Sequence, residues 1–349
     1  MSNGLFINDI VDDLSGKSRV ESPESYFPVI HKLGFGETST VWLCVSKEGG
    51  YFAVKVHAAT ISNRELQVTE RLVEAAKADA AVAEYCSLPV DQFQINGPNG
   101  THQAFVFPAA GPRVECIDLK TQNPAVLLRG LVRQVVEAVA AVHRQGICHG
   151  YTRPHNVLLG PDLPIGMAVA KALEHLGKPA KISVLHREGI SPGPKAPEYI
   201  VTPIEFVDRT GSHETDYTKL VSPKLKLVDF GDSFATSEPP SKEPGEWDTW
   251  SLIYVAPGLH VENRYAAAAK SDTWSLAISI FEIRIGELFL SREARSKDEF
   301  LEILIDLLGH LPEPWWSTAW GEHRRTVYKD EPDANGNAVY LESSSNRAS

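Results

Sequence analysis

ICHGYTRPHNVLL, residues 147–159, and KLKLVDFG, residues 224–231, are two mainly apolar stretches, and each carries one polar residue with metal-binding chemistry. The first holds Asn156 and the second holds Asp229. An amide oxygen and a carboxylate are hard ligands of the kind that Mg²⁺ takes when substrate phosphates complete its shell. Taken singly, each residue is more often a capping or turn residue. Both residues follow a glycine-rich segment and a strand that carries a lysine, described next. This order along the chain favours a phosphate-binding site.

A glycine-rich segment lies upstream, within HKLGFGETSTVWL. Gly34, Gly36 and Ser39 have absent or small side chains, so backbone N–H groups there can approach phosphate oxygens. Alone, the pattern is more typical of an ordinary hairpin turn. The next predicted strand, FAVKV, supplies Lys55 as a cation for the same phosphates. A lone lysine on a strand is usually solvent-facing, so the phosphate interpretation depends on the combination.

The hydrophobic pattern predicts a β-rich part followed by a helical part. Strand-like runs dominate residues 26–56, and helical periodicity follows over residues 63–85. Further helices are predicted at 126–145, 271–285 and 297–308. The Pro-rich connection between Asn156 and Asp229 is too long for a structureless loop and is predicted to hold a helix near residues 168–176.

Composition narrows the class of function. The chain has 349 residues, with 34 Lys and Arg against 45 Asp and Glu, a net charge of −11. This balance disfavours nucleic acid and anionic membranes and suits basic peptides. Since no long apolar run and no secretory pattern occurs, we expect a soluble protein of the cytoplasm or nucleus. The cysteines are far apart and lack a CxxC pair, which predicts buried reduced thiols rather than disulfides or a zinc site.

Taken together, the blocks resemble the eukaryotic protein kinases, and within them the SR-protein-kinase-like serine/threonine kinases of fungal type. The resemblance covers residues 26–320 and rests on the following segments: HKLGFGETSTVWL, FAVKV, GICHGYTRPHNVLL, KLKLVDFGDSF, SDTWSLAISIFEI and GHLPEPWW. It implies an α+β, bilobal protein-kinase-like fold, with a small β-rich N-lobe and a mainly helical, shortened C-lobe. The expected boundaries are an N-terminal extension at 1–25, the N-lobe at 26–108, the C-lobe at 109–328 with an insert at about 160–223, and a polar tail at 329–349.

The resemblance also implies a site for ATP and Mg²⁺. Lys55 is expected to contact the α- and β-phosphates and to pair with Glu65, although Glu70 is a competing partner and either glutamate can be solvated on its helix. Asn156 and Asp229 are expected to hold the metal ion. The remaining nucleotide contacts are expected from Leu33, Gly34, Gly36, Ser39, Val41, Ala53, Phe107, Pro108, Ala110 and Leu158.

The catalytic loop departs from the family pattern at its most important position. Tyr151 stands where active kinases have the aspartate that accepts the proton of the substrate hydroxyl. A tyrosine phenol, with an ordinary pKa near 10, is neutral at pH 7 and bulkier than a carboxylate. Positioned general bases contribute about 10²–10⁴-fold, so impaired phosphoryl transfer is expected. Arg153 stands where the family has lysine, and its guanidinium can still meet phosphate with a different reach.

Two glycines mark further departures. Gly150 stands where regulated kinases carry an arginine that binds an activation-loop phosphate. Gly258 stands at the glutamate of the family's APE motif, and the late arginine that would pair with it is missing. Asp272 is expected to anchor the catalytic loop, with a helix N-terminal carboxylate as the alternative.

Three hypotheses about function follow. The first is a pseudokinase that binds Mg-ATP, or keeps only the fold, and acts through partners. The alternative is an active ATP-dependent serine/threonine kinase that phosphorylates arginine/serine-rich proteins. The third is a decayed paralogue without a stable fold. Basic arginine/serine-rich proteins are the expected substrates or partners under the first two.

Overall fold

The structure is a computed structural model, and it divides into two compact units. Unit 1 comprises residues 1–138 and 157–229, and unit 2 comprises residues 139–156 and 230–349. The residues described are 19–21, 26–36, 38–59, 64–97, 100–116, 124–161, 168–184, 199–204, 221–237, 252–258, 268–290, 294, 296–319, 321–335 and 337–341. Most of the predicted N-terminal extension and much of the insert therefore lie outside the described residues. Within these ranges, none of the helices combines the length and the apolar content that a membrane crossing requires.

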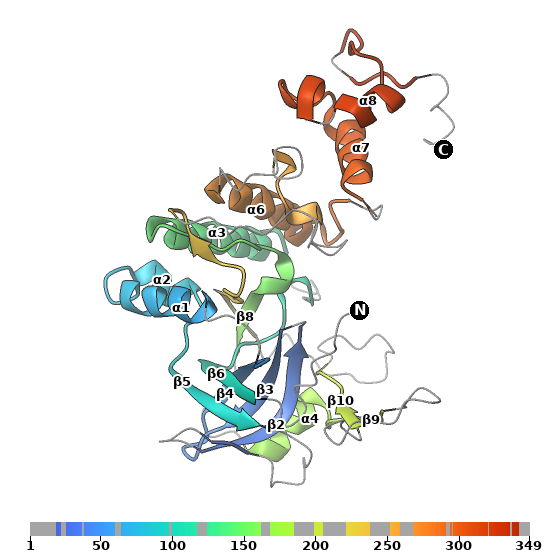
Figure 1. Ribbon diagram of the computed structural model, residues 1–349. Helices are drawn as coiled ribbons and strands as arrows, with labels where there is room; N and C mark the ends of the chain where they lie inside the picture. Colours follow the sequence, from blue (N-terminus) through green and yellow to red (C-terminus); the bar gives the residue numbers. More distant parts are fainter. Residues whose placement is uncertain are drawn as a thin grey trace. The chain divides into compact units, whose positions relative to one another are not determined.

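Unit 1 is built on a six-stranded antiparallel sheet with the strand order β1-β2-β3-β4-β6-β5 (Figure 1). The strands are β1 (Arg19–Glu21), β2 (Tyr26–Phe35), β3 (Ser39–Val45), β4 (Tyr51–His57), β5 (Asp91–Gly97) and β6 (Gly100–Pro108). β5 and β6 lie beyond the strand-like runs predicted over residues 26–56. The observed sheet places the predicted glycine-rich segment in the β2–β3 connection.

The register of the sheet separates its two faces. Val41 lies opposite Lys55, and Ala53 lies opposite Phe107. Side chains alternate along a strand, so these four residues share one face. The other face carries a buried apolar cluster whose sheet members include Trp42, Cys44, Val54, Val56, Phe93, Ala104 and Val106. Because the apolar core forms on that face, the opposite face, which carries Lys55, can accommodate the charged residues described below.

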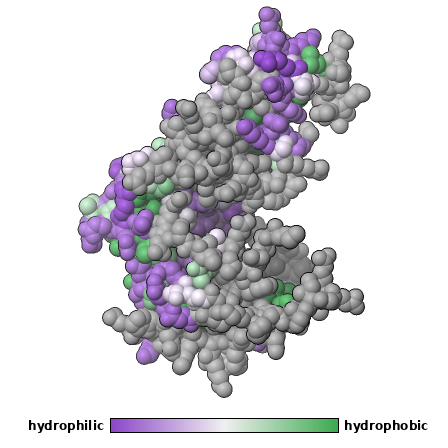
Figure 2. All heavy atoms as spheres, viewed as in Figure 1, coloured by the Kyte–Doolittle hydropathy of each residue, from purple (hydrophilic) through white to green (hydrophobic). Residues whose placement is uncertain are grey.

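The helical region predicted over residues 63–85 is two helices, α1 (Arg64–Ala75) and α2 (Ala80–Tyr85). The break comes at Asp79, whose Oδ1 accepts a hydrogen bond from the Ala81 backbone N–H at 3.0 Å. An aspartate in this N-cap position satisfies a backbone donor that a helix leaves unpaired. Hydrophilic residues cover most of the described surface over α1 and α2, and over α7 and α8 of unit 2 (Figure 2).

The remaining elements of unit 1 include a helix from the insert. These elements are η2 (Val114–Cys116), the first part of α3 (Pro124–Arg144), β8 (Val157–Pro161), α4 (Val169–Leu176), β9 (Lys181–Ser183), β10 (Tyr199–Val201) and β11 (Val221–Leu227). β8 pairs antiparallel with β11, and β9 with β10. The helix predicted near residues 168–176 is confirmed as α4. Its buried Ala172 and Leu176 belong to one cluster with Leu43 and Tyr51 of the sheet, so this helix of the insert contributes to the core of unit 1.

Unit 2 is mainly helical. It holds the end of α3, β7 (Ile147–Cys148), η3 (Pro154–Asn156), β12 (Phe234–Ala235), η5 (Leu252–Tyr254), α6 (Ala268–Ile285), α7 (Lys297–Leu308), a π-helical turn (Trp315–Ala319) and α8 (Gly321–Val327). The helices predicted at 271–285 and 297–308 are confirmed. α7 begins where the Ser296 hydroxyl accepts a hydrogen bond from the Glu299 N–H, and it ends at Gly309 with φ 87°.

The chain after α8 turns back onto unit 2. Tyr328 pairs with Tyr340 in an isolated antiparallel bridge, and the two rings lie 4.8 Å apart. The Leu341 N–H donates to the Val327 carbonyl at 2.9 Å, and the Tyr340 hydroxyl contacts Asp306 of α7. This return buries Tyr328 in the core of unit 2. Residues 329–335 are mostly exposed, as their polar composition suggests.

Candidate functional site

Lys55 lies at the centre of a charged cluster in unit 1. Its Nζ is 2.9 Å from each carboxylate oxygen of Glu65 and 2.8 Å from Oδ1 of Asp229. Lys55 and Glu65 are 8% and 5% exposed, while the side chain of Asp229 is 48% exposed. The competing Glu70 is exposed and instead accepts a hydrogen bond from Gln92. Lys55 therefore pairs with Glu65, as the resemblance implies.

Attraction between the opposite charges of this cluster offsets the free-energy cost of burying them. Burial alone would lower the pKa of Lys55, but the charges of Asp229 and Glu65 outweigh it, and the pKa lies above its ordinary value. Burial alone would raise the pKa of Glu65, but the Lys55 charge and the His57 side chain outweigh it, and this pKa lies below its ordinary value. Both groups are therefore charged at neutral pH.

Asp229 is held in an unusual backbone conformation. Its φ is 66°, in the left-handed region that residues with a Cβ rarely adopt. Strain of this kind costs on the order of 1–3 kcal/mol and persists where surrounding contacts enforce it, most often at functional sites. Here it directs a half-exposed carboxylate toward Lys55 at the end of β11.

The predicted glycine-rich turn leaves open space beside its backbone. A Cβ added at Gly34 or at Gly36 would meet no atom within 4 Å among those described. The Gly36 N–H donates to the Ser39 carbonyl at 2.9 Å, which closes the turn between β2 and β3. Packing among the described residues therefore does not require these glycines, and their contact with phosphate stays a prediction.

The other residues predicted to contact a nucleotide lie on the Lys55 face or beside it. Val41, Ala53 and Phe107 are half-buried on this face. The segment after Phe107 joins the sheet to β8: the Ala109 N–H donates to Tyr51, and the Gly111 N–H donates to Leu159. The remaining predicted residues adjoin these strands: Leu33 and Leu158 are half-buried, Pro108 is exposed, and Ala110 is half-buried.

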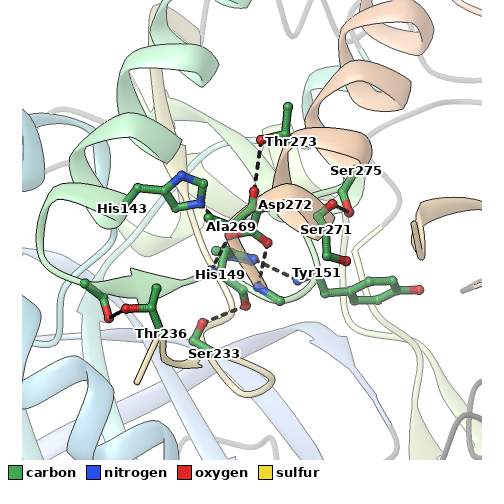
Figure 3. Close-up of polar contacts among 12 residues, drawn as sticks. His143, His149, Tyr151, Ser233, Thr236, Ala269, Ser271, Asp272, Thr273 and Ser275 are labelled. Carbon is green, nitrogen blue, oxygen red and sulfur yellow. Dashed lines mark hydrogen bonds and ion pairs between the residues drawn. The ribbon is translucent and has the colours of Figure 1, made fainter. Parts of the chain in front are cut away.

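Asp272 of α6 fixes the loop that follows β7 in unit 2 (Figure 3). Its carboxylate accepts hydrogen bonds from the backbone N–H groups of His149 at 2.7 Å and Gly150 at 2.9 Å, and it contacts His143 Nε2 at 2.9 Å. Ser233 donates to the His149 carbonyl at 2.8 Å. Asp272 is 1% exposed. The anchoring contact predicted for Asp272 is therefore present, and both carboxylate oxygens are used.

Cys148 adds a third metal-ligating atom to this group. The ligand atoms of His143, Cys148 and Asp272 all lie within 4.8 Å of one another. Burial, followed by the nearby Asp272 charge, raises the pKa of the Cys148 thiol to about 12. Because the thiol is protonated and the carboxylate is already bonded to the loop, the group fits a structural role better than a metal site. Cys44, Cys86 and Cys148 are buried and free, as the sequence predicted.

Tyr151, predicted to stand where the family has its catalytic aspartate, packs its side chain into the core of unit 2. It is 9% exposed and lies edge-on to Tyr254, with ring centroids 6.1 Å apart. Arg153 Nη1 donates to the phenol oxygen at 2.9 Å, and the guanidinium carbon lies 4.3 Å from the ring centroid. The ring points away from Asp272 (Figure 3). Arg153, predicted to meet phosphate, is thus engaged by Tyr151.

Asn156 is positioned by the same loop. Its Nδ2 donates to the Tyr151 backbone carbonyl at 3.0 Å, which leaves Oδ1 as the atom with metal-binding chemistry. Asn156 belongs to unit 2 and Asp229 to unit 1. Their joint role as metal ligands stays a prediction.

The two glycine departures have physical explanations in unit 2. Gly150 has φ 82°, and a Cβ there would lie 2.4 Å from the Asp232 carbonyl oxygen, so only glycine fits. A Cβ at Gly258 would lie 3.0 Å from the Trp315 ring. The indole therefore fills the space into which the family's glutamate would extend, while the buried Arg324 pairs with Asp330 at 2.6 Å.

One residue of the charged cluster was missed by the sequence analysis. His57 Nε2 lies 2.9 Å from Glu65 Oε2, and its side chain is 7% exposed. The signal was available in the strand alternation, which places His57 on the same face of β4 as Lys55.

No family model matches the chain. Among curated proteins, the serine/threonine-protein kinase SRPK of Physarum polycephalum is 25% identical over 315 residues, which cover 83% of this chain and 68% of that protein. A serine/threonine protein kinase of Aspergillus fumigatus is 32% identical over 129 residues, 35% of this chain and 32% of that protein. SKY1 of Saccharomyces cerevisiae is 26% identical over 148 residues, 39% of this chain and 20% of that protein. The chain thus aligns with about two thirds of the first relative's length and a third or less of the other two.

A crystal structure of a kinase domain matches the fold. The TM-score is 0.54 at 17% sequence identity, and the match covers 88% of this chain and 78% of that one. This likeness establishes the architecture. The chain has a bilobal, α+β protein-kinase-like fold, and in sequence it is an SR-protein-kinase-like serine/threonine kinase homologue.

Proposed function

We propose that this SR-protein-kinase-like chain binds Mg-ATP but transfers phosphate weakly or not at all. The observation that carries the proposal is a contrast between the two units. The Lys55–Glu65–Asp229 cluster is complete, whereas the position of the catalytic base holds the Tyr151 phenol, bonded to Arg153.

The residues of unit 1 fit a nucleotide. Lys55 presents a buried, permanently charged ammonium, held in place by Glu65. The space beside Gly34 and Gly36 suits a phosphate chain that approaches backbone N–H groups. Val41 and Ala53 give the same sheet face an apolar section on which an adenine ring can pack.

The donor set also suits Mg²⁺. Asp229 has a half-exposed carboxylate, and Asn156 keeps an amide oxygen, and both are oxygen ligands that this ion prefers. A bound Mg²⁺ would neutralise charge on the phosphates. Within unit 1 the chain orients Asp229 through Lys55, and within unit 2 it orients Asn156 through the Tyr151 carbonyl.

The loop of unit 2 supports impairment. A carboxylate base needs to accept a proton from the substrate hydroxyl, but the Tyr151 phenol is neutral and its oxygen already accepts a hydrogen bond from Arg153. Moving the phenol toward a substrate would cost its packing against Tyr254 and its contact with Arg153. The loop is thus well anchored but lacks a free base.

An active kinase is the second candidate. The anchored loop and the complete Lys55 cluster favour it, because phosphoryl transfer depends chiefly on positioning and charge neutralisation. Names among the relatives, such as SRSF protein kinase 3 of Mus musculus, point to arginine/serine-rich substrates for those proteins. We propose basic arginine/serine-rich proteins as partners or substrates here, in keeping with the net charge of −11.

Calorimetric titration of the whole chain with Mg-ATP tests the nucleotide part. We expect saturable binding that Lys55→Met weakens at least about 30-fold, because a buried charge partner is lost. Lys47→Met, a change at an exposed lysine next to the β3–β4 turn, is the matched control and should bind like the wild type. Absence of binding in the wild type, or equal binding by Lys55→Met, would refute this part.

Transfer of phosphate to an arginine/serine-rich peptide tests the impairment. The wild type should be as inactive as Asp229→Asn, and Tyr151→Asp should exceed both. A wild type that matches Tyr151→Asp and far exceeds Asp229→Asn would establish the active kinase instead.

A further inference from the structure

We propose that His57 is a positioning residue for the nucleotide site: its imidazole holds the Glu65 carboxylate so that Lys55 stays correctly placed. The inference rests on the proposed Mg-ATP site, because it assigns a residue that supports that site. None of the motifs in the sequence pointed to this histidine.

His57 and Lys55 approach the same oxygen of Glu65 from one strand. His57 follows Lys55 by two positions on β4, so both side chains project from the same face toward the first turn of α1. Nε2 of His57 lies 2.9 Å from Oε2 of Glu65, and Lys55 Nζ lies 2.9 Å from that same oxygen. The contact with His57 is close but not linear, since it falls short of a well-directed hydrogen bond. Glu65 is thus shared between two side chains of one strand.

The imidazole is the donor in its contact with Glu65. Two lone pairs at 2.9 Å would repel each other, so Nε2 carries the hydrogen that faces the carboxylate. Glu65 Oε2 is therefore the acceptor for both Lys55 and His57.

Neighbouring residues hold both the ring and the backbone of His57 in place. Its ring lies edge-on to Phe105, with centroids 5.6 Å apart and an interplanar angle of 81°. Nδ1 of the buried His102 lies 2.8 Å from the His57 backbone carbonyl. Two neighbouring contacts thus hold the ring and the backbone of His57. A side chain held in this way can orient the group that it touches.

The contact between His57 and Glu65 should matter most when Lys55 binds phosphate. Lys55 is bonded to three carboxylate oxygens, and a phosphate draws its ammonium away from them. His57 can then become the main partner of Glu65 Oε2, with the contact straightening as Lys55 withdraws. Without His57, a buried carboxylate would depend on Lys55 alone, and α1 would be held less firmly.

The test compares two replacements of similar size in the whole chain. His57→Leu removes the donor, whereas His57→Gln keeps an N–H that can reach Glu65. We expect His57→Leu to weaken Mg-ATP binding about fivefold and His57→Gln to stay within about twofold of the wild type, because His57→Leu leaves the buried Glu65 carboxylate without one of its two polar neighbours. His31→Leu removes a buried histidine from β2, which β3 separates from β4 in the sheet, and should leave the affinity unchanged.

A double-mutant cycle shows whether the effect passes through Glu65. In a Glu65→Gln background, His57→Leu should cause no further loss of affinity. Equal losses for His57→Leu and His57→Gln, or a full additional loss in the Glu65→Gln background, would overturn the proposal.

Hydrogen exchange of the α1 amides without nucleotide separates this inference from the proposed function. His57→Leu should speed exchange in α1, and His57→Gln and His31→Leu should not. If the wild type fails to bind Mg-ATP but shows this exchange pattern, the nucleotide site is wrong and the His57 contact is right. If exchange in α1 is the same in all four proteins, the His57 inference is wrong whatever the nucleotide result.

Discussion

Arg153 lies across the ring of Tyr151 and donates a hydrogen bond from Nη1 to the phenol oxygen at 2.9 Å. Both positions were expected to depart from the kinase pattern, and the two side chains contact each other. The guanidinium of Arg153 is thus engaged by the Tyr151 phenol within the same loop.

The pair should be energetically coupled. Tyr151→Phe removes the acceptor of Arg153 Nη1 and should lower the free energy of unfolding by about 1–2 kcal/mol, because a partly buried donor loses its partner. In an Arg153→Met background the same change should cost much less. Differential scanning calorimetry of the four proteins measures this, and additive losses would show that the contact contributes nothing.

Gly150 should tolerate no side chain. Gly150→Ala places a Cβ 2.4 Å from the Asp232 carbonyl oxygen at φ 82°, so it should destabilise unit 2 by about 2 kcal/mol or more. Gly130→Ala, in the middle of α3 with open space around its Cβ, should instead stabilise by up to about 1 kcal/mol. Thermal unfolding of both variants checks the contrast, and a harmless Gly150→Ala would contradict the close approach.

The Trp315 ring should prevent a larger side chain from occupying the space beside Gly258. Gly258→Glu, which restores the family's residue type, should destabilise by about 1–3 kcal/mol because it collides with the indole ring. A smaller loss is expected for the same substitution in a Trp315→Leu background. Urea unfolding gives the two values, and an equal loss in both backgrounds would show that the ring is not the obstacle.

The Lys55–Glu65 pair should contribute stability at neutral pH and lose it in acid. The pKa of Glu65 is lowered, so its contribution is fully present above the ordinary carboxyl value of 4.5 and disappears as the pH falls through the folded-state value. The pKa of Lys55 is raised, so its contribution is fully present below the ordinary value of 10.5 and is lost only at higher pH.

The measurable form is the stability difference between the wild type and Glu65→Gln. It should be constant from about pH 6 to 9 and shrink from about pH 4.5 downward. Glu70→Gln, at the exposed glutamate of the same helix, should show a difference near zero throughout. A wild-type advantage over Glu65→Gln that persists unchanged at pH 3 would contradict the charged pairing.

How well the sequence predicted each contact depends on how far apart the two contacting residues are in the chain. The Lys55–Glu65 pair and the Asp272 anchor were expected from the resemblance to the protein kinases, because local pattern alone left Glu70 and a helix N-terminal role for Asp272 as alternatives. α7 was also predictable, since Ser296 and Gly309 mark its ends. The break between α1 and α2 was missed because the alanine-rich run hides the cap at Asp79.

The contacts that were missed join residues far apart in the chain. The position of Trp315 beside Gly258, and of Tyr340 against Tyr328 and Asp306, depends on packing that no local pattern encodes. The capture of Arg153 by Tyr151 was missed for a different reason. Both residues were singled out, but their separate comparison with the family did not consider the contact between them.

Single-turnover transfer from Mg-ATP to an arginine/serine-rich peptide tests the central claim most directly. The proteins to compare are the wild type, Tyr151→Asp, and Tyr151→Asp combined with Arg153→Lys. We predict that the double variant exceeds the wild type by about 10²–10⁴-fold, the range that a positioned general base contributes. Tyr151→Asp alone should fall between them, because Arg153 can pair with the new carboxylate. A wild-type rate equal to that of the double variant, with Mg-ATP bound in both, would show that the missing base does not limit this protein.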